Sequence, residues 1–315
     1  MALFMLDLIK EAKKRLAPYI YETPTIRLEG LDEILGCQVY VKADCMQKTN
    51  SFKIRGALNK MLQLAPEQLE HGVIAVSSGN HGKGVAYAAK MLGIPCTIVL
   101  TDSAPKIKQQ GISDLGAKAI LCPLKERQAL AKKLSEENGY AIIPPYDDYD
   151  IIAGQGTAGL EIMGQIPDVD AVVVPVSGGG LISGISAAVK LTRPDVKVYG
   201  AEPEVIGRYY KSYQAGERLT VPQAKSIADA LLVLTPGEIN YKMVAEYVDE
   251  LIQVDEEFIR KGARTLVEQG KVMCEPSSGI GMGAALQGSL RVKATDKVCF
   301  FISGGNAQLE QLAAL

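Results

Sequence analysis

One stretch of the chain decides its fold: AVVVPVSGGGLISG, residues 171–184. An apolar run of strand length ends in a glycine cluster, and a helix-like segment begins directly behind it. Glycines in such a turn allow several backbone N–H groups to converge on one phosphate at the helix N-terminus. A dinucleotide-binding turn is the competing interpretation, because Glu202 ends the next strand-like run, but Ser183 stands where the third glycine of G-x-G-x-x-G belongs. The stretch therefore predicts a phosphate site without identifying the ligand.

The same alternation of strand and helix extends over nearly the whole chain. Strand-like apolar runs lie at residues 37–41, 73–76, 96–100, 118–121, 171–176, 197–201 and 297–302. Helix-like segments separate most of these runs, which predicts an α/β protein with mostly parallel, doubly wound sheets. Ligands in such sheets bind beyond the carboxyl ends of the strands, so the polar turns at those ends are the candidate site.

The composition excludes several classes of function. The 315 residues carry a formal net charge of −2 with both signs mixed along the sequence, so we expect no nucleic-acid or membrane partner. The apolar start of the chain is soon interrupted by charged residues, and no later run is long enough to cross a bilayer, which predicts a cytoplasmic protein. Six scattered cysteines and only two histidines predict reduced core thiols and disfavour histidine-rich zinc sites.

A lysine follows the first of these strands in QKTNSFKIRGA, residues 47–57. Lys53 stands there among small and apolar neighbours, just before a helix-forming segment. Partial desolvation lowers the pKa of such an amine, and the neutral amine can attack a carbonyl, as a Schiff-base lysine does. A solvated surface lysine is the plain alternative, and the neighbouring motifs decide against it.

Two more strands end in polar turns. In VIAVSSGNHG, residues 73–82, hydroxyls, an amide and free N–H groups meet at a helix N-terminus that could bind a substrate carboxylate, although an ordinary helix cap explains the same residues. In VCFFISGGN, residues 298–306, the polar turn is Ser-Gly-Gly-Asn.

In this order, the four motifs resemble those of the fold type II pyridoxal-phosphate enzymes, specifically the serine/threonine dehydratases and serine racemases. The resemblance runs from Thr23 to Asn306 and includes IAGQGT at 152–157, SIAD at 226–229 and EPSSG at 275–279. It implies the tryptophan synthase β-like fold: two doubly wound open-sheet domains with pyridoxal 5'-phosphate in the cleft between them. It also implies a large cofactor-binding domain, residues 1–68 and 149–315, and a small inserted domain, residues 69–148.

The resemblance assigns roles by matching positions. Lys53 is implied as the Schiff-base lysine and as the base that removes the substrate Cα proton, with Ser303 on the pyridine nitrogen. The cofactor-binding residues that it implies are Phe52, Lys53, Asn80, Ser177, Gly178, Gly179, Gly180, Leu181 and Ser303. The substrate-binding residues that it implies are Ser51, Ser77, Ser78, Asn80 and His81, with Arg127 as a further candidate.

Two of these positions bear on the kind of reaction. Ser78 matches the serine that faces the opposite side of the substrate in racemases, and a helix-cap serine is its plain alternative. Arg127 matches a racemase position near the distal end of the substrate, but it also fits a solvated charged stretch. The resemblance also suggests a cation site, where Glu202 matches one carboxylate ligand and Arg208 replaces the second. A guanidinium there repels a cation, so we predict no bound metal and a Glu202–Arg208 pair.

The sequence therefore predicts a pyridoxal-phosphate-dependent lyase. Its expected reaction is dehydration of a small β-hydroxy amino acid (serine, threonine or 3-hydroxyaspartate) to a keto acid and ammonia, carried out by a homodimer. The alternative is a serine- or aspartate-type racemase that uses Lys53 and Ser78 as bases on opposite faces. A β-replacement synthase is a more distant alternative, because the lysine and glycine-loop motifs of those enzymes differ.

Overall fold

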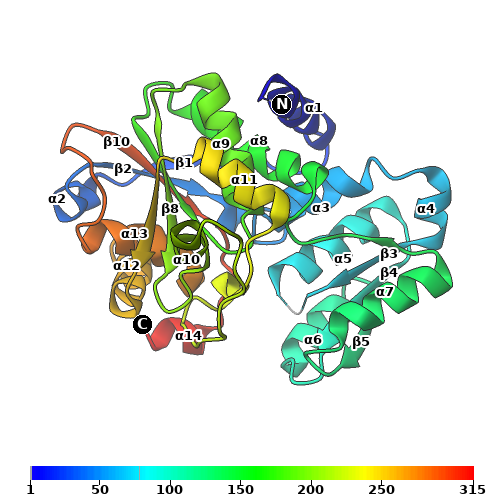
Figure 1. Cartoon of the computed structure of the whole chain (residues 1–315). Coiled ribbons are helices and arrows are strands. Elements are labelled where there is room, and N and C mark those ends of the chain that lie inside the picture. Colours follow the sequence, from blue (N-terminus) through cyan, green and yellow to red (C-terminus); the bar gives the residue numbers. More distant parts are fainter. Residues whose placement is uncertain (1, 78) are drawn as a thin grey trace.

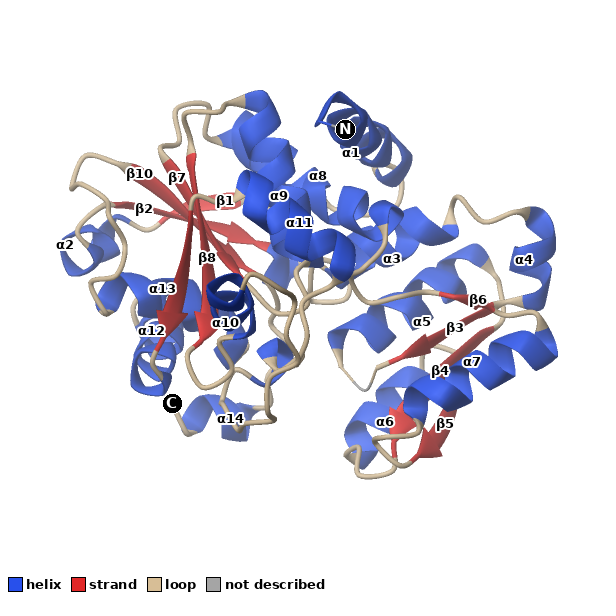
Figure 2. Cartoon of the chain, viewed as in Figure 1, coloured by secondary structure: helices blue, strands red, loops and turns tan. Residues whose placement is uncertain are grey.

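Two separate sheets organise the chain, as the computed structural model of residues 2–77 and 79–315 shows (Figures 1 and 2). The larger sheet has six strands in the order β1-β2-β10-β7-β8-β9. Its strands are β1 (Thr25–Arg27), β2 (Gln38–Ala43), β7 (Ala171–Pro175), β8 (Lys197–Pro203), β9 (Glu250–Val254) and β10 (Lys297–Ile302). All neighbours in this sheet pair in parallel except the edge strand β1, which runs antiparallel to β2.

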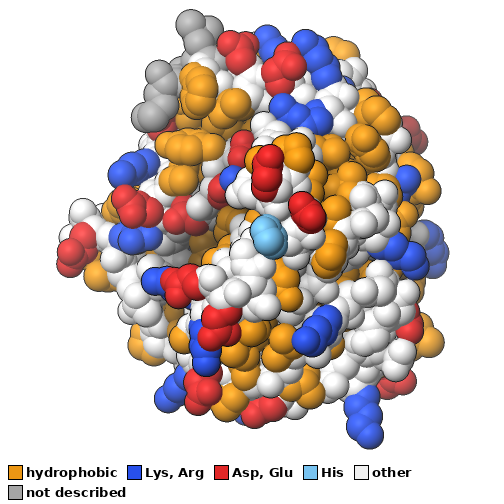
Figure 3. Space-filling view, turned by 90° about the vertical axis from the view of Figure 1, so that its right-hand side faces the viewer, with side chains coloured by type: hydrophobic (Ala, Val, Ile, Leu, Met, Phe, Trp, Pro, Cys, Tyr) orange, Lys and Arg blue, Asp and Glu red, His pale blue; other side chains and the backbone are white. Residues whose placement is uncertain are grey.

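The smaller sheet has four parallel strands in the order β5-β4-β3-β6. These are β3 (Val73–Val76), β4 (Cys96–Thr101), β5 (Lys118–Cys122) and β6 (Ala141–Ile142). Figure 3 looks onto this side of the molecule and shows basic and acidic side chains intermixed over it. The fold prediction is confirmed: all seven predicted strands are present, and β1, β6 and β9 were not predicted.

Helices cover both faces of each sheet, which makes both doubly wound. The helices are α1 (Ala2–Leu16), α2 (Asp32–Leu35), α3 (Lys53–Met61), α4 (Pro66–His71), α5 (Asn80–Leu92), α6 (Lys106–Ser113), α7 (Arg127–Asn138), α8 (Tyr149–Gln165), α9 (Gly180–Thr192), α10 (Arg208–Ala215), α11 (Glu238–Tyr247), α12 (Glu256–Glu268), α13 (Ile280–Leu286) and α14 (Leu309–Ala313). In the larger sheet, α8 and α9 pack on one face and α12 and α13 on the other. In the smaller sheet, α5 and α7 lie on opposite faces.

The segment that returns the chain from the smaller sheet is anchored by two aspartates. Asp148 is the N-cap of α8, where its carboxylate accepts from the N–H groups of Asp150 and Ile151. Asp147 accepts from the N–H groups of Glu238 and Ile239, at 2.8 and 2.9 Å, and so caps the start of α11. The helix α3 packs against both α5 and α8. The division of the chain at residues 68/69 and 148/149 stays a prediction.

Four buried charges join β2, α3 and α8. Arg55 on α3 contacts Asp44 at 2.7 Å and Glu161 at 2.6 Å, and Lys42 contacts Glu161 at 2.6 Å. None of the four side chains is more than 4 % exposed. Such groups are tolerated inside a protein only when they are paired and hydrogen-bonded, and here each one is. The six cysteines are also buried and all are free thiols, as predicted.

The close packing of α8 on α9 generates a stability prediction. A Cβ on Gly184 would lie 2.3 Å from the carbonyl oxygen of Ile152 and 2.6 Å from the nitrogen of Gly156, both backbone atoms that cannot turn aside. We expect Gly184→Ala to lower the free energy of unfolding by about 1–3 kcal/mol. Gly164→Ala is the matched control, because nothing lies within 4 Å of the position that its Cβ would take, and it should raise stability by up to ~1 kcal/mol. Denaturant unfolding of both variants checks this, and equal effects would contradict it.

Candidate active site

The predicted motifs meet at one edge of the larger sheet. The strands β2, β10 and β7 are parallel neighbours, so their carboxyl ends lie side by side. Lys53, Ser303 and Ser177 follow these strands in turn. The Lys53 segment and the Ser303 turn are in direct contact, since the N–H of Phe52 donates to the carbonyl of Ser303 at 3.0 Å. A short antiparallel bridge joins Ser51 to Gly304 beside it.

Lys53 is the first residue of α3, and its amine points at the return segment. The Nζ donates to the carbonyl oxygen of Pro145 at 2.8 Å. Burial lowers the pKa of the Lys53 amine to about 8, although the carboxylate of Glu275 acts in the opposite direction. A substantial share of the amine is therefore neutral near physiological pH, which is the form that attacks a carbonyl.

The glycine loop after β7 leaves no room for side chains. A Cβ on Gly178 would lie 2.5 Å from the ring of Tyr146, and one on Gly179 would lie 2.0 Å from the hydroxyl of Tyr209. Gly179 also has a φ of 108°, which favours glycine. Within residues 2–77 and 79–315, the N–H groups of Ser177, Gly178 and Gly179 have no acceptor. Free N–H groups at the start of α9 form a site for an anion such as a phosphate.

Ser303 lies in a hydroxyl cluster at the end of β10. Its Oγ is 2.9 Å from the Oγ of Ser278, which also accepts from the N–H of Gly304 at 2.9 Å. Phe52 packs edge-on against Phe301, with ring centroids 6.4 Å apart. The contact with Ser278 therefore holds the hydroxyl of Ser303 in place at the end of β10.

Asn80, the first residue of α5, contacts two residues near the end of the chain, Glu275 and Asn306. Its Nδ2 donates to both carboxylate oxygens of Glu275, at 3.0 and 2.9 Å, and its Oδ1 accepts from Asn306 at 2.8 Å. Lys83 donates to the same Asn306 at 2.7 Å. Burial raises the pKa of Glu275 to about 7, and the hydrogen bonds from Asn80 oppose that shift. The start of α5, which follows β3 of the smaller sheet, is thus tied to Glu275 and to the turn after β10 of the larger sheet.

Comparisons with known proteins identify the family of this chain. Residues 16–304 match the family model described as "Pyridoxal-phosphate dependent enzyme". This chain is a pyridoxal-phosphate-dependent enzyme. It is 42% identical over 309 residues to the L-threonine ammonia-lyase of Thermotoga maritima, covering 98% of this chain and 77% of the relative. It is 39% identical to the serine racemase of Arabidopsis thaliana, over 96% of this chain and 93% of the relative. The structure of maize serine racemase superimposes with a TM-score of 0.93 at 37% identity, covering 98% of this chain and 95% of that one.

The structure brings only some of the predicted substrate residues of the enzyme close to the candidate site. The hydroxyl of Ser51 is buried and has no partner among the described residues, and Ser77 accepts from the N–H of Gly79 at 3.2 Å. Burial lowers the pKa of His81 to about 3, so its ring is neutral, and its Nε2 lies 2.9 Å from the carbonyl of Ile143. Ser78 lies outside the described residues. Arg127 begins α7 and donates to the carbonyl of Leu124, and no contact joins it to another described residue of the predicted site.

The Glu202–Arg208 pair that the sequence predicts is present and fully buried. The Nη1 of Arg208 lies 3.6 Å from the Oε2 of Glu202. The carboxylate oxygens of Glu202 also accept from the N–H groups of Tyr209 and Tyr210, at 3.2 and 2.9 Å. A divalent cation does not fit this arrangement, because a guanidinium stands beside the carboxylate and no cluster of three or more metal-binding side chains occurs among residues 2–77 and 79–315. The absence of a bound metal in the enzyme stays a prediction.

Three residues of the enzyme's candidate site were not predicted. Glu275 and Ser278 belong to the EPSSG motif, to which the sequence assigned no role, and Tyr146 lies just before the predicted domain boundary at residues 148/149. A buried carboxylate is indicated in sequence only by its apolar neighbours, and Glu275 follows the buried Cys274. Nothing in the sequence signals that Tyr146 covers the glycine loop.

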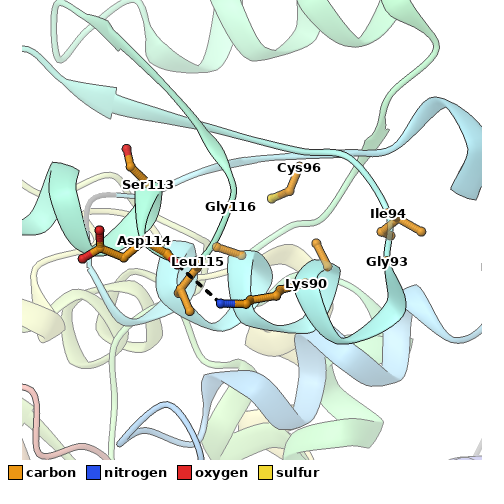
Figure 4. A pocket seen from close by; sticks show the side chains of 10 residues that line it. Lys90, Gly93, Ile94, Cys96, Ser113, Asp114, Leu115 and Gly116 are labelled. Atoms are coloured by element: carbon orange, nitrogen blue, oxygen red, sulfur yellow. Dashed lines mark hydrogen bonds between the residues drawn. The ribbon is translucent and has the colours of Figure 1, made fainter.

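A hollow of about 260 Å³ lies apart from the candidate site (Figure 4). It is lined by residues of α5, β4 and the end of α6, and Lys90 there donates to the carbonyl of Asp114 at 3.4 Å. Burial raises the pKa of Cys96, its one thiol, to about 12, so that thiol is not a nucleophile. None of the predicted site residues lines this hollow.

The raised pKa of Glu275 generates a prediction about pH. The folded protein holds the proton of Glu275 more tightly than the unfolded chain does, so this carboxyl lowers stability as the pH rises from about 4.5 to 7. We expect Glu275→Gln to raise the melting temperature of the cofactor-free protein at pH 8, by roughly 2–6 °C, and to change it little at pH 5. Glu204→Gln on the surface is the control and should change neither value. A Glu275→Gln effect of the same size at both pH values would refute the assigned pKa.

Proposed function

We propose that this enzyme dehydrates a small β-hydroxy amino acid to a keto acid and ammonia, with serine, threonine and 3-hydroxyaspartate as the candidate substrates. The observation that carries the proposal is the Lys53 amine: burial lowers its pKa to about 8, and it donates to Pro145, the residue before the Tyr146 ring that packs on Gly178. The similarity to a threonine ammonia-lyase and to serine racemases supports the same class of substrate.

The residues present fit pyridoxal phosphate. The free N–H groups of Ser177, Gly178 and Gly179 and the start of α9 would hold its phosphate. Lys53 would hold its aldehyde carbon, and the hydroxyl of Ser303 would hydrogen-bond its ring nitrogen. When bound, the cofactor supplies an electron-withdrawing ring that makes the Cα–H bond of an attached amino acid acidic.

The protein then performs the proton transfers. Lys53 takes the Cα proton, and loss of the β-hydroxyl as water leaves an enamine that hydrolyses to the keto acid and ammonia. Ser303 is a hydroxyl and not a carboxylate, so it does not hold the ring nitrogen protonated, which favours rapid loss of a β-leaving group over a long-lived carbanion. Ser51, Ser77, Asn80 and the N–H groups at the start of α5 would bind the substrate carboxylate.

Racemisation is the second candidate function, and Ser78 is the residue that favours it. Both reactions begin with removal of the Cα proton by Lys53. Racemisation needs a second group that returns a proton from the other face, and Ser78 is proposed for that role. Arg127 is proposed to contact an acidic substrate side chain, although its observed hydrogen bond is to Leu124 in the turn before α7.

The enzyme is further proposed to work as a homodimer in the cytoplasm. Among residues 2–77 and 79–315, no helix combines the length and the apolar character needed to span a membrane.

Lys53 generates a prediction with a defined pH dependence. The neutral amine increases as the pH rises, so the rate at which apoprotein takes up pyridoxal phosphate should rise with a midpoint at about pH 8. Borohydride should then fix the cofactor on the peptide that contains Lys53. Lys53→Ala should abolish the adduct and lower turnover by roughly 10³-fold or more, whereas Lys48→Ala should alter neither. A borohydride adduct on another lysine in mass spectra would refute the assignment.

Product analysis separates dehydration from racemisation. L-serine, L-threonine and threo-3-hydroxyaspartate are each incubated with the enzyme, and keto acid and both enantiomers are measured in the same samples. We expect keto acid as the major product, and Ser78→Ala should retain it. More inverted amino acid than keto acid, lost in Ser78→Ala, would make the protein a racemase.

A further inference from the structure

Arg208 is a fully buried guanidinium that the proposed chemistry does not use. It is the first residue of α10. Its Nη1 donates to the carbonyl oxygens of Val176 and Ser177, at 2.9 and 3.1 Å, and its Nη2 donates to that of Leu231. Burying a guanidinium is costly unless its donors are satisfied. Its partners are therefore informative, and two of them lie at the start of the glycine loop.

The next residue continues the same series of contacts. The hydroxyl of Tyr209 donates to the carbonyl oxygen of Gly178 at 3.0 Å, and the N–H of Gly237 donates to the same oxygen at 3.0 Å. Arg208 and Tyr209 together thus bind the carbonyls of three consecutive residues, Val176, Ser177 and Gly178. Glu202 holds this helix start in place by accepting from the N–H groups of Tyr209 and Tyr210.

These contacts orient the N–H groups of the loop. In a trans peptide the carbonyl of one residue and the N–H of the next point in opposite directions, and the described chain has no cis peptide bond. Carbonyls directed at Arg208 and Tyr209 therefore turn the N–H groups of Ser177, Gly178 and Gly179 to the other side. These are the N–H groups that have no acceptor among the described residues. Several N–H groups converging in this way form an anion cradle.

We propose that Arg208 is a positioning residue for the cofactor phosphate: it fixes the glycine loop from behind so that the loop N–H groups converge. The inference rests on the proposed assignment of this loop to the phosphate. Arg208 acts through the loop carbonyls and does not touch the phosphate. Glu202 balances its charge inside the protein, where an unpaired cation would be unfavourable.

The geometry requires an arginine. The planar guanidinium has donors on separate nitrogen atoms and here reaches carbonyls on two segments, at residues 176–177 and at Leu231. A lysine would keep the charge beside Glu202, but its single ammonium could not make the same set of contacts. Arg208→Lys therefore separates the hydrogen-bonding geometry from the charge.

The test compares two ligands of the apoprotein, pyridoxal phosphate and pyridoxal, which lacks the phosphate. Arg208→Lys should raise the Kd of pyridoxal phosphate about 10–100-fold, because the carbonyls and N–H groups of the glycine loop lose their fixed orientation. It should leave the Kd of pyridoxal nearly unchanged. Tyr209→Phe, which removes one carbonyl contact, should act in the same direction by a smaller factor. Arg27→Lys is the matched control: Arg27 also donates to a carboxylate and a carbonyl, away from the site, and should change neither Kd.

The proposal would be overturned if Arg208→Lys raised the Kd of both ligands by the same factor or changed neither Kd. Arg208 would then serve the fold alone. If Arg208→Lys does not fold, the neutral double variant Glu202→Gln/Arg208→Gln is measured instead, and the same ratio of Kd values decides.

Hydrogen exchange separates this inference from the assignment of the loop. Pyridoxal phosphate should slow exchange in the wild-type peptide that spans residues 171–184, and pyridoxal should not. If the wild-type loop gains no protection, the phosphate assignment itself fails, and the role of Arg208 fails with it. If the wild type and Arg208→Lys gain equal protection, the loop assignment holds and the role of Arg208 is refuted.

Discussion

The buried charge cluster of Lys42, Asp44, Arg55 and Glu161 is the interaction on which the rest of the structure depends. It joins a strand of the larger sheet to the two helices, α3 and α8, that stand between the sheets. Removing one partner would leave an uncompensated buried charge, at a cost of about 3–5 kcal/mol. Lys53 lies two residues before Arg55, so the position of the reactive amine is set by this cluster as well as by its own contact with Pro145.

A second buried pair, Glu202 with Arg208, serves the opposite end of the candidate site. The first cluster fixes the helix that carries the lysine, and the second fixes the turn that carries the free N–H groups. Both are ionic arrangements inside the protein, where broken pairs are costly and geometry is therefore strongly specified.

Much of this fold could be predicted because its strands are apolar runs that end in glycine and serine. The short strands β1 and β6 were not predicted, because β1 has only three residues and β6 only two, too few to show a periodic pattern. Strand β9, ELIQV, has only two fully buried positions and so lacked a continuous apolar run. The sequence placed Lys53, Ser177 and Ser303 at one edge of the sheet, since parallel strands end together.

The remainder of the site depends on contacts between distant parts of the chain. Asn80 was predicted as a ligand of the cofactor ring, yet its amide is engaged by Glu275, 195 residues away in the sequence. Tyr146 covers the glycine loop through a contact that no local pattern encodes. His81 is neutral and bonded to a backbone carbonyl, because burial outweighs the usual preference of imidazole for water.

The return segment at residues 144–149 has a consequence for how such an enzyme can be changed. It carries the acceptor of the Lys53 amine, the ring that covers Gly178 and the caps of α8 and α11. The smaller sheet and its helices therefore cannot be exchanged as a unit without affecting the candidate site. Deleting them or replacing them together with residues 144–149 would remove part of the candidate catalytic machinery. Opening the chain at this point for circular permutation would disturb the same contacts. Grafts that enter the chain before β3 and leave 144–149 intact keep these contacts of the return segment, but they still have to supply Ser77 and Asn80.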